Sequence, residues 1–207
     1  MEWSSVDGFI FDVDGTLYNQ KKLRRGMLLR LMAYYGLRIH RMREPYAIYL
    51  FRKLREKPEC KSMRFDELYG IIERKVGLSS AVIAGVIQRW MFDEPLDLIR
   101  KTAYTDLIRF IKRQRENGKK IIIYSDYPAS DKLKSLELPF DYMFTFSENG
   151  INEQKPSLNV MNQIVNTIKV PSDRLIYVGD RDDKDKKSAE MMQIQYYDIA
   201  DFLKIIA

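Results

Sequence analysis

The sequence predicts an α/β fold in which a doubly wound, Rossmann-like parallel sheet is interrupted by one inserted domain of helices. Three observations support this prediction. An apolar strand at residues 8–11 is followed by two aspartates, residues 18–100 show apolar residues at helical spacing only, and residues 101–207 alternate between helix and strand patterns. Strands that alternate with helices form parallel sheets covered on both faces. We therefore expect a core made of residues 1–17 and 101–207, and a helical insert over residues 18–100.

The first strand ends at a pair of carboxylates. Gly8–Phe11 is followed by Asp12, Val13, Asp14 and then Gly15, which allows a sharp turn. Side chains two residues apart in an extended chain point the same way, so Asp12 and Asp14 could share one small volume. Like charges there raise each other's pKa unless a cation neutralises them, and a hard divalent ion with oxygen ligands is the simplest remedy.

The insert is expected to contain about four helices. Gly77 suits the end of the third of them, and Ser79 is a suitable N-cap for the fourth. The segments with helical spacing are 23–35, 46–54, 65–76 and 81–90.

Beyond Pro95 the pattern alternates. The expected elements are a helix at 103–116, strands at 120–124 and near 142–146, a helix after Pro156, a strand at 175–178, a helix near 187–192 and a strand at 196–199. In such sheets ligands bind at the carboxyl ends of the strands, where Asp12, Ser125 and Asp180 would lie.

Composition narrows the class of protein. The 207 residues are 45% hydrophobic, which is enough for a packed core, and no apolar run approaches the roughly 20 residues of a spanning helix. The single cysteine, Cys60, cannot form an internal disulfide and fits a reducing compartment. We therefore expect a cytoplasmic monomer or homodimer with no membrane association.

The net charge of +6 is concentrated in the insert. Residues 18–100 contain 18 Lys and Arg against 9 Asp and Glu. Such a basic segment would attract phosphorylated or carboxylated substrates, although most charged residues on helices only keep a face in water. One alternative is therefore a non-catalytic protein that holds polyanions with this segment.

Four motifs, taken in order, resemble those of the haloacid dehalogenase-like hydrolases. They are Asp-Val-Asp-Gly-Thr-Leu at 12–17, Ile-Ile-Ile-Tyr-Ser-Asp at 121–126, Lys-Pro at 155–156 and Tyr-Val-Gly-Asp-Arg-Asp-Asp-Lys-Asp at 177–185. The resemblance covers residues 8–17 and about 103–199. It implies that the insert is a helical cap of the kind that closes over the active site in many members of the family.

The resemblance also implies a role for each motif residue. Asp12 would be the nucleophile that forms an aspartyl phosphate, and Asp14 the general acid and base. Ser125 would donate a hydrogen bond to a phosphoryl oxygen, and Lys155 would neutralise charge on the phosphate and the nucleophile. Asp126 would contact phosphate donors or its own loop, so Ser125, Asp126 and Lys155 form the expected phosphate site.

Mg²⁺ is the cofactor that the resemblance implies. Its ligands would be Asp12, the backbone carbonyl of Asp14, Asp180 and a second acid of the last motif. Position 184 is Lys, so Asp185 is the better choice for that acid. The alternatives that stay open are Asp182 and Asp183.

These expectations point to a magnesium-dependent phosphatase that acts on a small phosphorylated metabolite, with a sugar or polyol phosphate favoured. Members of the family that cleave carbon–halogen bonds lack the second acid, so Asp14 favours phosphoryl transfer. A phosphomutase or a nucleotide phosphatase would use the same core residues. A phospho-accepting receiver domain would be shorter and would lack the insert. No nucleic-acid partner is expected.

Overall fold

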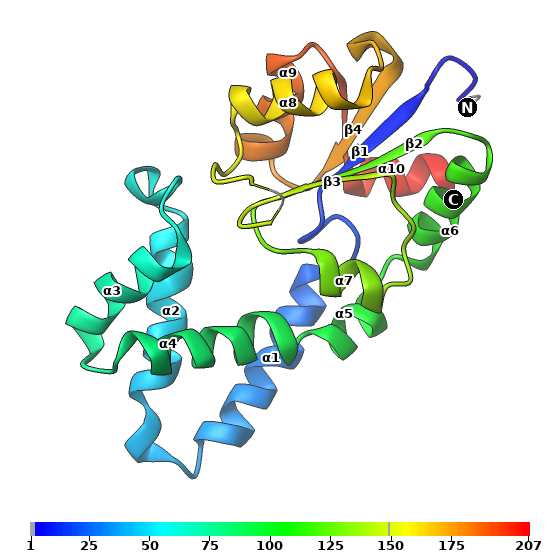
Figure 1. The fold of residues 1–207 in the computed structure, drawn as a ribbon. Helices are drawn as coiled ribbons and strands as arrows, with labels where there is room; N and C mark the ends of the chain where they lie inside the picture. The colour runs from blue at the N-terminus through cyan, green and yellow to red at the C-terminus, as the bar shows by residue number, and fades with distance from the viewer. Residues whose placement is uncertain (1–2, 149) are drawn as a thin grey trace. The chain divides into compact units, whose positions relative to one another are not determined.

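A five-stranded parallel sheet forms the centre of the core in the computed structural model, which describes residues 3–148 and 150–207 (Figure 1). The strand order is β3-β2-β1-β4-β5, and each neighbouring pair is parallel. The strands are β1 (Gly8–Phe11), β2 (Lys120–Ser125), β3 (Tyr142–Thr145), β4 (Leu175–Gly179) and β5 (Gln195–Asp198). Because β1 is the central strand, the residues that follow it emerge in the middle of the sheet's carboxyl edge.

Helices cover both faces of the sheet, as the doubly wound prediction requires. On one face lie α6 (Thr105–Glu116) and α10 (Ile199–Ile206), and on the other lie α8 (Leu158–Ile168) and α9 (Lys187–Met191) (Figure 1). Alternate residues of β1 serve the two faces, because successive side chains of a strand point in opposite directions.

The packing of β1 shows this alternation directly. The ring of Phe9 meets that of Phe110 in α6 at a centroid distance of 5.4 Å, and Phe11 meets Phe202 in α10 at 6.4 Å. Ile10, between them, belongs to the buried cluster on the opposite face, which includes Met161 in α8. The strand is therefore buried on both sides and holds a fixed position.

The fold class is confirmed, and the differences lie at element boundaries. The last strand was expected to end at residue 199, but it ends at Asp198. The side chain of Asp198 accepts a hydrogen bond from Ala200 N at 2.7 Å and caps α10, which begins at Ile199. A short helix after β2, α7 (Ser130–Ser135), was also not expected. Glu148 holds its first turn by accepting from Ala129 N at 2.9 Å and from the Ser130 hydroxyl at 2.7 Å.

The insert between β1 and β2 is helical throughout. It contains α1 (Gln20–Tyr35), α2 (Arg43–Arg55), α3 (Phe65–Val76), α4 (Ser80–Ile87) and α5 (Leu96–Thr102). Gly77 ends α3 in the left-handed conformation at φ 68°, and Ser79 caps α4 by accepting from Val82 N, as expected. The chain continues from α4 into a π-helical stretch, Gln88–Asp93, and the fifth helix, α5, is additional to the four expected.

The chain divides into two compact units. One consists of the described residues up to Gln20 together with Thr102–Ala207, and the other is Lys21–Lys101. The second unit has its own core, in which Phe51, Leu68, Ile72 and Ile83 are fully buried. None of the described helices combines the length and the apolar character needed to cross a membrane.

Candidate active site

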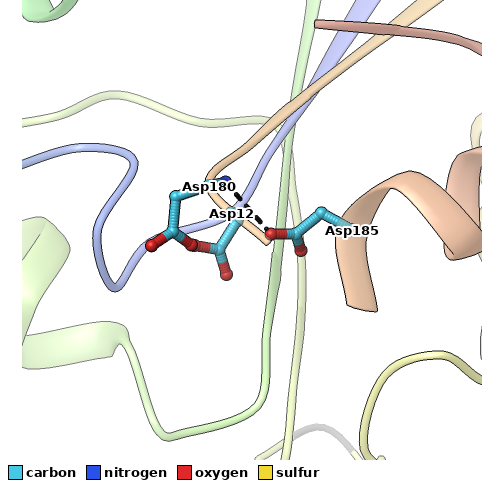
Figure 2. Close-up of side chains that lie close together, drawn as sticks. All are labelled: Asp12, Asp180 and Asp185. Carbon is cyan, nitrogen blue, oxygen red and sulfur yellow. Dashed lines mark hydrogen bonds between the residues drawn. The ribbon is translucent and has the colours of Figure 1, made fainter. Parts of the chain in front are cut away.

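Three carboxylates meet at the carboxyl ends of β1 and β4. Asp12 follows β1, Asp180 follows β4, and Asp185 lies in the π-helical turn Asp182–Lys186 (Figure 2). One oxygen of each carboxylate lies within 4.8 Å of an oxygen of the other two. Asp12 and Asp185 are buried and Asp180 is partly exposed. Since β1 and β4 are paired in register, their ends bring these acids together from opposite halves of the sequence.

Two glycines make room for this cluster. Gly15 turns at φ 109°, and a Cβ atom there would lie 2.1 Å from an oxygen of Asp180. A Cβ atom at Gly179 would lie 2.4 Å from Cβ of Asp185. Real Cβ contacts are never so short, so both positions require glycine for the acids to stay where they are.

Asp185 is the most firmly held of the three acids. Its Oδ2 accepts hydrogen bonds from the backbone N–H groups of Asp180 and Arg181 at 3.2 and 3.1 Å. Its Oδ1 accepts from Lys155 Nζ at 2.6 Å and from the Tyr177 hydroxyl at 3.1 Å. A buried carboxylate with this many donors is fixed in orientation.

The other two acids of the loop lie outside the cluster. Asp182 and Asp183 are exposed, and Asp183 pairs with Arg181 at 2.7 Å. Of the three acids considered for the second position of the last motif, the geometry brings only Asp185 beside Asp12 and Asp180.

Lys155 is the cation of the site. It is 2% exposed, and its Nζ donates to Asp12 Oδ1 at 2.5 Å, to Asp185 Oδ1 at 2.6 Å and to the carbonyl of Tyr124 at 3.1 Å. Burial by itself would lower the pKa of Lys155, but Asp12 and Asp185 raise that pKa well above its ordinary value. The ammonium group therefore stays charged.

The carboxylates carry more charge than Lys155 neutralises. Burial, reinforced by Asp185 and Asp180 and opposed by Lys155, raises the pKa of Asp12 to about 8. Burial and Asp185 raise the pKa of Asp180 to about 6. Three close oxygen ligands in a buried site with excess negative charge suit a hard divalent cation, so the donor set fits a metal ion.

Asp14 points its carboxylate to a different set of partners. Both of its oxygens lie 2.7 Å from Lys132 Nζ in α7, and one also accepts a hydrogen bond from the Tyr18 hydroxyl. Burial would raise the pKa of Asp14, but the Lys132 ammonium and the hydrogen bonds lower it below its ordinary value. These partners thus favour the ionised form of the Asp14 side chain beside the cluster, and a metal role would fall to its backbone carbonyl, as the sequence resemblance implies.

Lys132 and Tyr18 were not identified from the sequence. Tyr18 is fully buried and directly follows the first motif, four residues after Asp14. Its closeness to Asp14 in the sequence could therefore have indicated that its hydroxyl contacts this acid. Lys132 is one polar residue on a six-residue helix, and nothing in its surroundings distinguishes it from a solvated lysine.

The structure also places the two residues at the end of β2. Ser125 is 2% exposed and accepts a hydrogen bond from Tyr127 N at 3.3 Å. Asp126 uses both carboxylate oxygens, since Oδ1 accepts from Lys155 N at 2.7 Å and Oδ2 from Lys184 Nζ at 2.8 Å. Its side chain is therefore directed to two protein donors in the motif loops.

The sequence comparison decides the family. The model of the family described as haloacid dehalogenase-like hydrolase matches residues 9–199. The chain belongs to this family. A glyceraldehyde 3-phosphate phosphatase of Methanopyrus kandleri is 26% identical over 198 residues, and the match covers 89% of this chain and 79% of that protein.

Solved structures of other haloacid dehalogenase-like proteins share the fold. The HAD-hydrolase YfnB of Bacillus subtilis, bound to magnesium, has a TM-score of 0.65 at 14% identity, covering 97% of this chain and 98% of that one. A HAD phosphatase of Thermococcus onnurineus has a TM-score of 0.56 at 17% identity, with 98% of both chains covered. A 2-haloacid dehalogenase of Pseudomonas syringae reaches 0.64 at 16% identity, covering 92% of this chain and 85% of that one. Because both phosphatases and dehalogenases share this fold, the reaction must be argued from the site.

Proposed function

We propose that this haloacid dehalogenase-like hydrolase is a magnesium-dependent phosphatase that acts on a small phosphorylated metabolite, with a sugar or polyol phosphate as the favoured class. The observation that carries the proposal is the cluster of Asp12, Asp180 and Asp185, of which Asp12 and Asp185 are buried, next to a further acid, Asp14. The match to a glyceraldehyde 3-phosphate phosphatase supports the substrate class.

Asp12, Asp180 and Asp185 would hold Mg²⁺, together with the backbone carbonyl of Asp14. Their donor atoms are the hard oxygens that this ion prefers. When bound, the ion supplies positive charge that offsets the phosphoryl oxygens and lets an anionic substrate approach an anionic nucleophile.

In the first step, a carboxylate oxygen of Asp12 attacks phosphorus. The bond between phosphorus and the leaving oxygen breaks, and that oxygen takes a proton from the carboxyl group of Asp14. Lys155, 2.5 Å from Asp12, neutralises charge on the nucleophile and the phosphoryl group. Ser125, at the carboxyl end of the neighbouring strand, would donate its hydroxyl to a phosphoryl oxygen.

In the second step, the carboxylate of Asp14 removes a proton from water, whose oxygen attacks the phosphorus of the aspartyl phosphate. The bond from phosphorus to Asp12 breaks, phosphate leaves, and Asp14 is again protonated for the next cycle. The hydrogen bonds from Lys132 and Tyr18 favour the ionised form of Asp14, which is the form that removes the proton from water. The proton gained in this step is the one that Asp14 donates to the leaving oxygen in the next cycle.

Asp14 also favours phosphoryl transfer over cleavage of a carbon–halogen bond. In the family pattern, members that cleave carbon–halogen bonds lack this second acid. Release of an alcohol from a phosphate ester needs an acid that protonates the leaving oxygen, whereas a halide ion leaves without a proton. The position of Asp14, two residues after the nucleophile, therefore supports the phosphatase assignment.

The test is a panel of phosphorylated metabolites assayed for phosphate release with Mg²⁺ and with chelator. Sugar, polyol and nucleotide phosphates form its three arms, and a 2-chloro acid assayed for chloride release is the control for dehalogenation. We expect magnesium-dependent phosphate release that is lost in Asp12→Asn and retained in Asp182→Asn, because Asp182 is exposed. Release of chloride in place of phosphate, or equal turnover by Asp12→Asn, would overturn the proposal.

A further inference from the structure

We infer that Asp126 and Lys184 form a positioning pair that fixes Lys155 against the carboxylate cluster, and that the side chain of Asp126 is not a phosphate ligand. The inference deepens the proposed function, because Lys155 is the cation that this function assigns to the phosphoryl group. It concerns only side chains of the core unit.

The pair joins two loops that are distant in sequence. Asp126 follows β2, and Lys184 lies in the π-helical turn after β4. Lys184 Nζ donates to Asp126 Oδ2 at 2.8 Å, and the two residues are 8% and 7% exposed. A buried ion pair is costly to desolvate, so we attribute this one to the geometry that it fixes.

The fixed element is the backbone of Lys155. Asp126 Oδ1 accepts a hydrogen bond from Lys155 N at 2.7 Å, while Oδ2 is occupied by Lys184. One carboxylate thus ties the loop that carries Lys155 to the turn that carries Lys184. Both of its oxygens are used, and its negative charge would repel a phosphate dianion.

The π-helical turn supplies two contacts from adjacent residues. The carbonyl of Arg181 accepts from the backbone N–H groups of Lys184 and Asp185 at 3.3 and 2.7 Å. The side chains of Lys184 and Asp185 are buried; Lys184 donates to Asp126, and Asp185 accepts from Lys155. Short π-helical segments are frequent at functional sites, where they redirect side chains.

These contacts hold Lys155 at both its backbone and its side chain. Its backbone N–H is held by Asp126, its Nζ is held by Asp185, and the two holders are linked through Lys184, which neighbours Asp185 in the chain. The ammonium group is therefore held at both ends relative to one acid of the cluster. A change at the Asp126–Lys184 pair should move Lys155 without removing any group that contacts the substrate.

The charge of Asp126 matters because of Lys184. An asparagine at 126 could still accept from Lys155 N, but it would remove the negative charge that Asp126 places 2.8 Å from the buried ammonium of Lys184. Loss of either partner should therefore have the same effect, and loss of both should cost little more than loss of one.

The first experiment compares Asp126→Asn, Lys184→Met and the double variant. Their matched controls are Lys186→Met, which alters an exposed lysine of the same turn, and Asp131→Asn, which alters an exposed acid of α7. We expect kcat to fall by about 10- to 100-fold in each single variant, the range for a misplaced catalytic group, with a much smaller change in KM. The double variant should lose about as much as either single variant, and the controls should match the wild type. Wild-type kcat in Lys184→Met, or multiplied losses in the double variant, would overturn the inference.

The second experiment asks whether the pair acts through Lys155. In a Lys155→Met background, Lys184→Met should cause no further loss of kcat, whereas a general weakening of the fold would add to it. Thermal unfolding identifies any variant that fails to fold. In that event Lys184→Gln, which keeps a donor without the charge, takes its place. It should lower kcat relative to the wild type and cause no further loss in the Lys155→Met background.

A third measurement does not depend on activity. In protein labelled with ¹⁵N-lysine, the amide signal of Lys155, assigned by its absence from Lys155→Met, should move in Lys184→Met and stay in place in Lys186→Met. If the signal moves while the wild type releases no phosphate from any substrate, the proposed function fails and the positioning pair stands. If the signal does not move, the positioning pair fails.

Discussion

Lys132 Nζ lies 2.7 Å from each carboxylate oxygen of Asp14. The two residues come from α7 and from the loop after β1, and the side chain of Lys132 is only 8% exposed. A cation held this way favours the ionised form of Asp14 and fixes its orientation near Asp12. The pH dependence of activity should therefore respond to Lys132.

Lys132→Met should shift the acid limb of the kcat–pH profile to higher pH. Lys132 lowers the pKa of Asp14 against the effect of burial, so its removal lets that pKa rise, and the base form then appears only at higher pH. The check is kcat measured from pH 4.5 to 8, with Lys134→Met, an exposed lysine of the same helix, as the control. An acid limb that stays in place would exclude Lys132 from tuning Asp14.

Asp12→Asn should abolish turnover and leave the fold intact. Loss of a nucleophile costs on the order of 10⁴- to 10⁶-fold in kcat, since no other group can take its place in the covalent step. Lys155 keeps a carboxylate partner in Asp185, so the melting temperature should change by no more than a few degrees. Phosphate release and thermal unfolding of the same preparation check both parts.

Mg²⁺ should stabilise the protein more at pH 8 than at pH 5. The pKa of Asp12 is raised from its ordinary 3.8 to about 8 and that of Asp180 to about 6, so the metal-free folded state binds protons more tightly than the unfolded state. Its stability therefore falls as the pH rises from about 4 to about 8. Mg²⁺ competes with protons for the same oxygens and replaces the stability that is lost.

Melting temperatures with Mg²⁺ and with chelator, taken across this pH range, test the relationship. The gain from Mg²⁺ should shrink in Asp180→Asn and persist in Asp182→Asn, since only Asp180 belongs to the cluster. A gain from Mg²⁺ that is equal at both ends of the range would count against metal binding by these carboxylates.

Gly179→Ala should damage the site and Gly85→Ala should not. A Cβ atom at 179 would lie 2.4 Å from Cβ of Asp185, so the turn must shift, at a cost of about 1–3 kcal/mol of stability and of most Mg²⁺-dependent activity. Gly85, exposed within α4, has no atom within 4 Å of such a Cβ, so alanine there should stabilise by roughly 0.5–1 kcal/mol. Urea unfolding and phosphate release report the two effects.

Part of the candidate site could be predicted from the sequence, because several of its residues directly follow predicted strands of a parallel sheet. Asp12 and Asp180 follow strands that pair in a parallel sheet, so the alternation of helix and strand patterns places them at one edge. The turn after β4 was ambiguous, because its run of acids does not reveal which side chain faces inward. The π-helical geometry that buries Asp185 has no signature in the residues themselves.

The supporting residues could not be predicted in the same way. Lys132, Lys184 and Asp126 are charged residues whose roles depend on a partner from a distant segment. A single sequence reports periodicity and local turn chemistry, and a lysine that reaches a buried carboxylate has the same local pattern as one in water. Likewise, α7 depends on hydrogen bonds that Ala129 N and the Ser130 hydroxyl donate to Glu148, and not on an apolar repeat of its own.

The central position of β1 has a consequence for how the protein matures. Gly8 pairs with Lys120 on one side and with Leu175 on the other, so β1 leaves the ribosome well before either of the strands that pair with it. During that interval its phenylalanines lack the aromatic rings of α6 and α10 that bury them. Asp12 gains Lys155, Asp180 and Asp185 as neighbours only after residues 155–185 have been synthesised, so a nascent chain that stops before them carries Asp12 without the rest of the cluster.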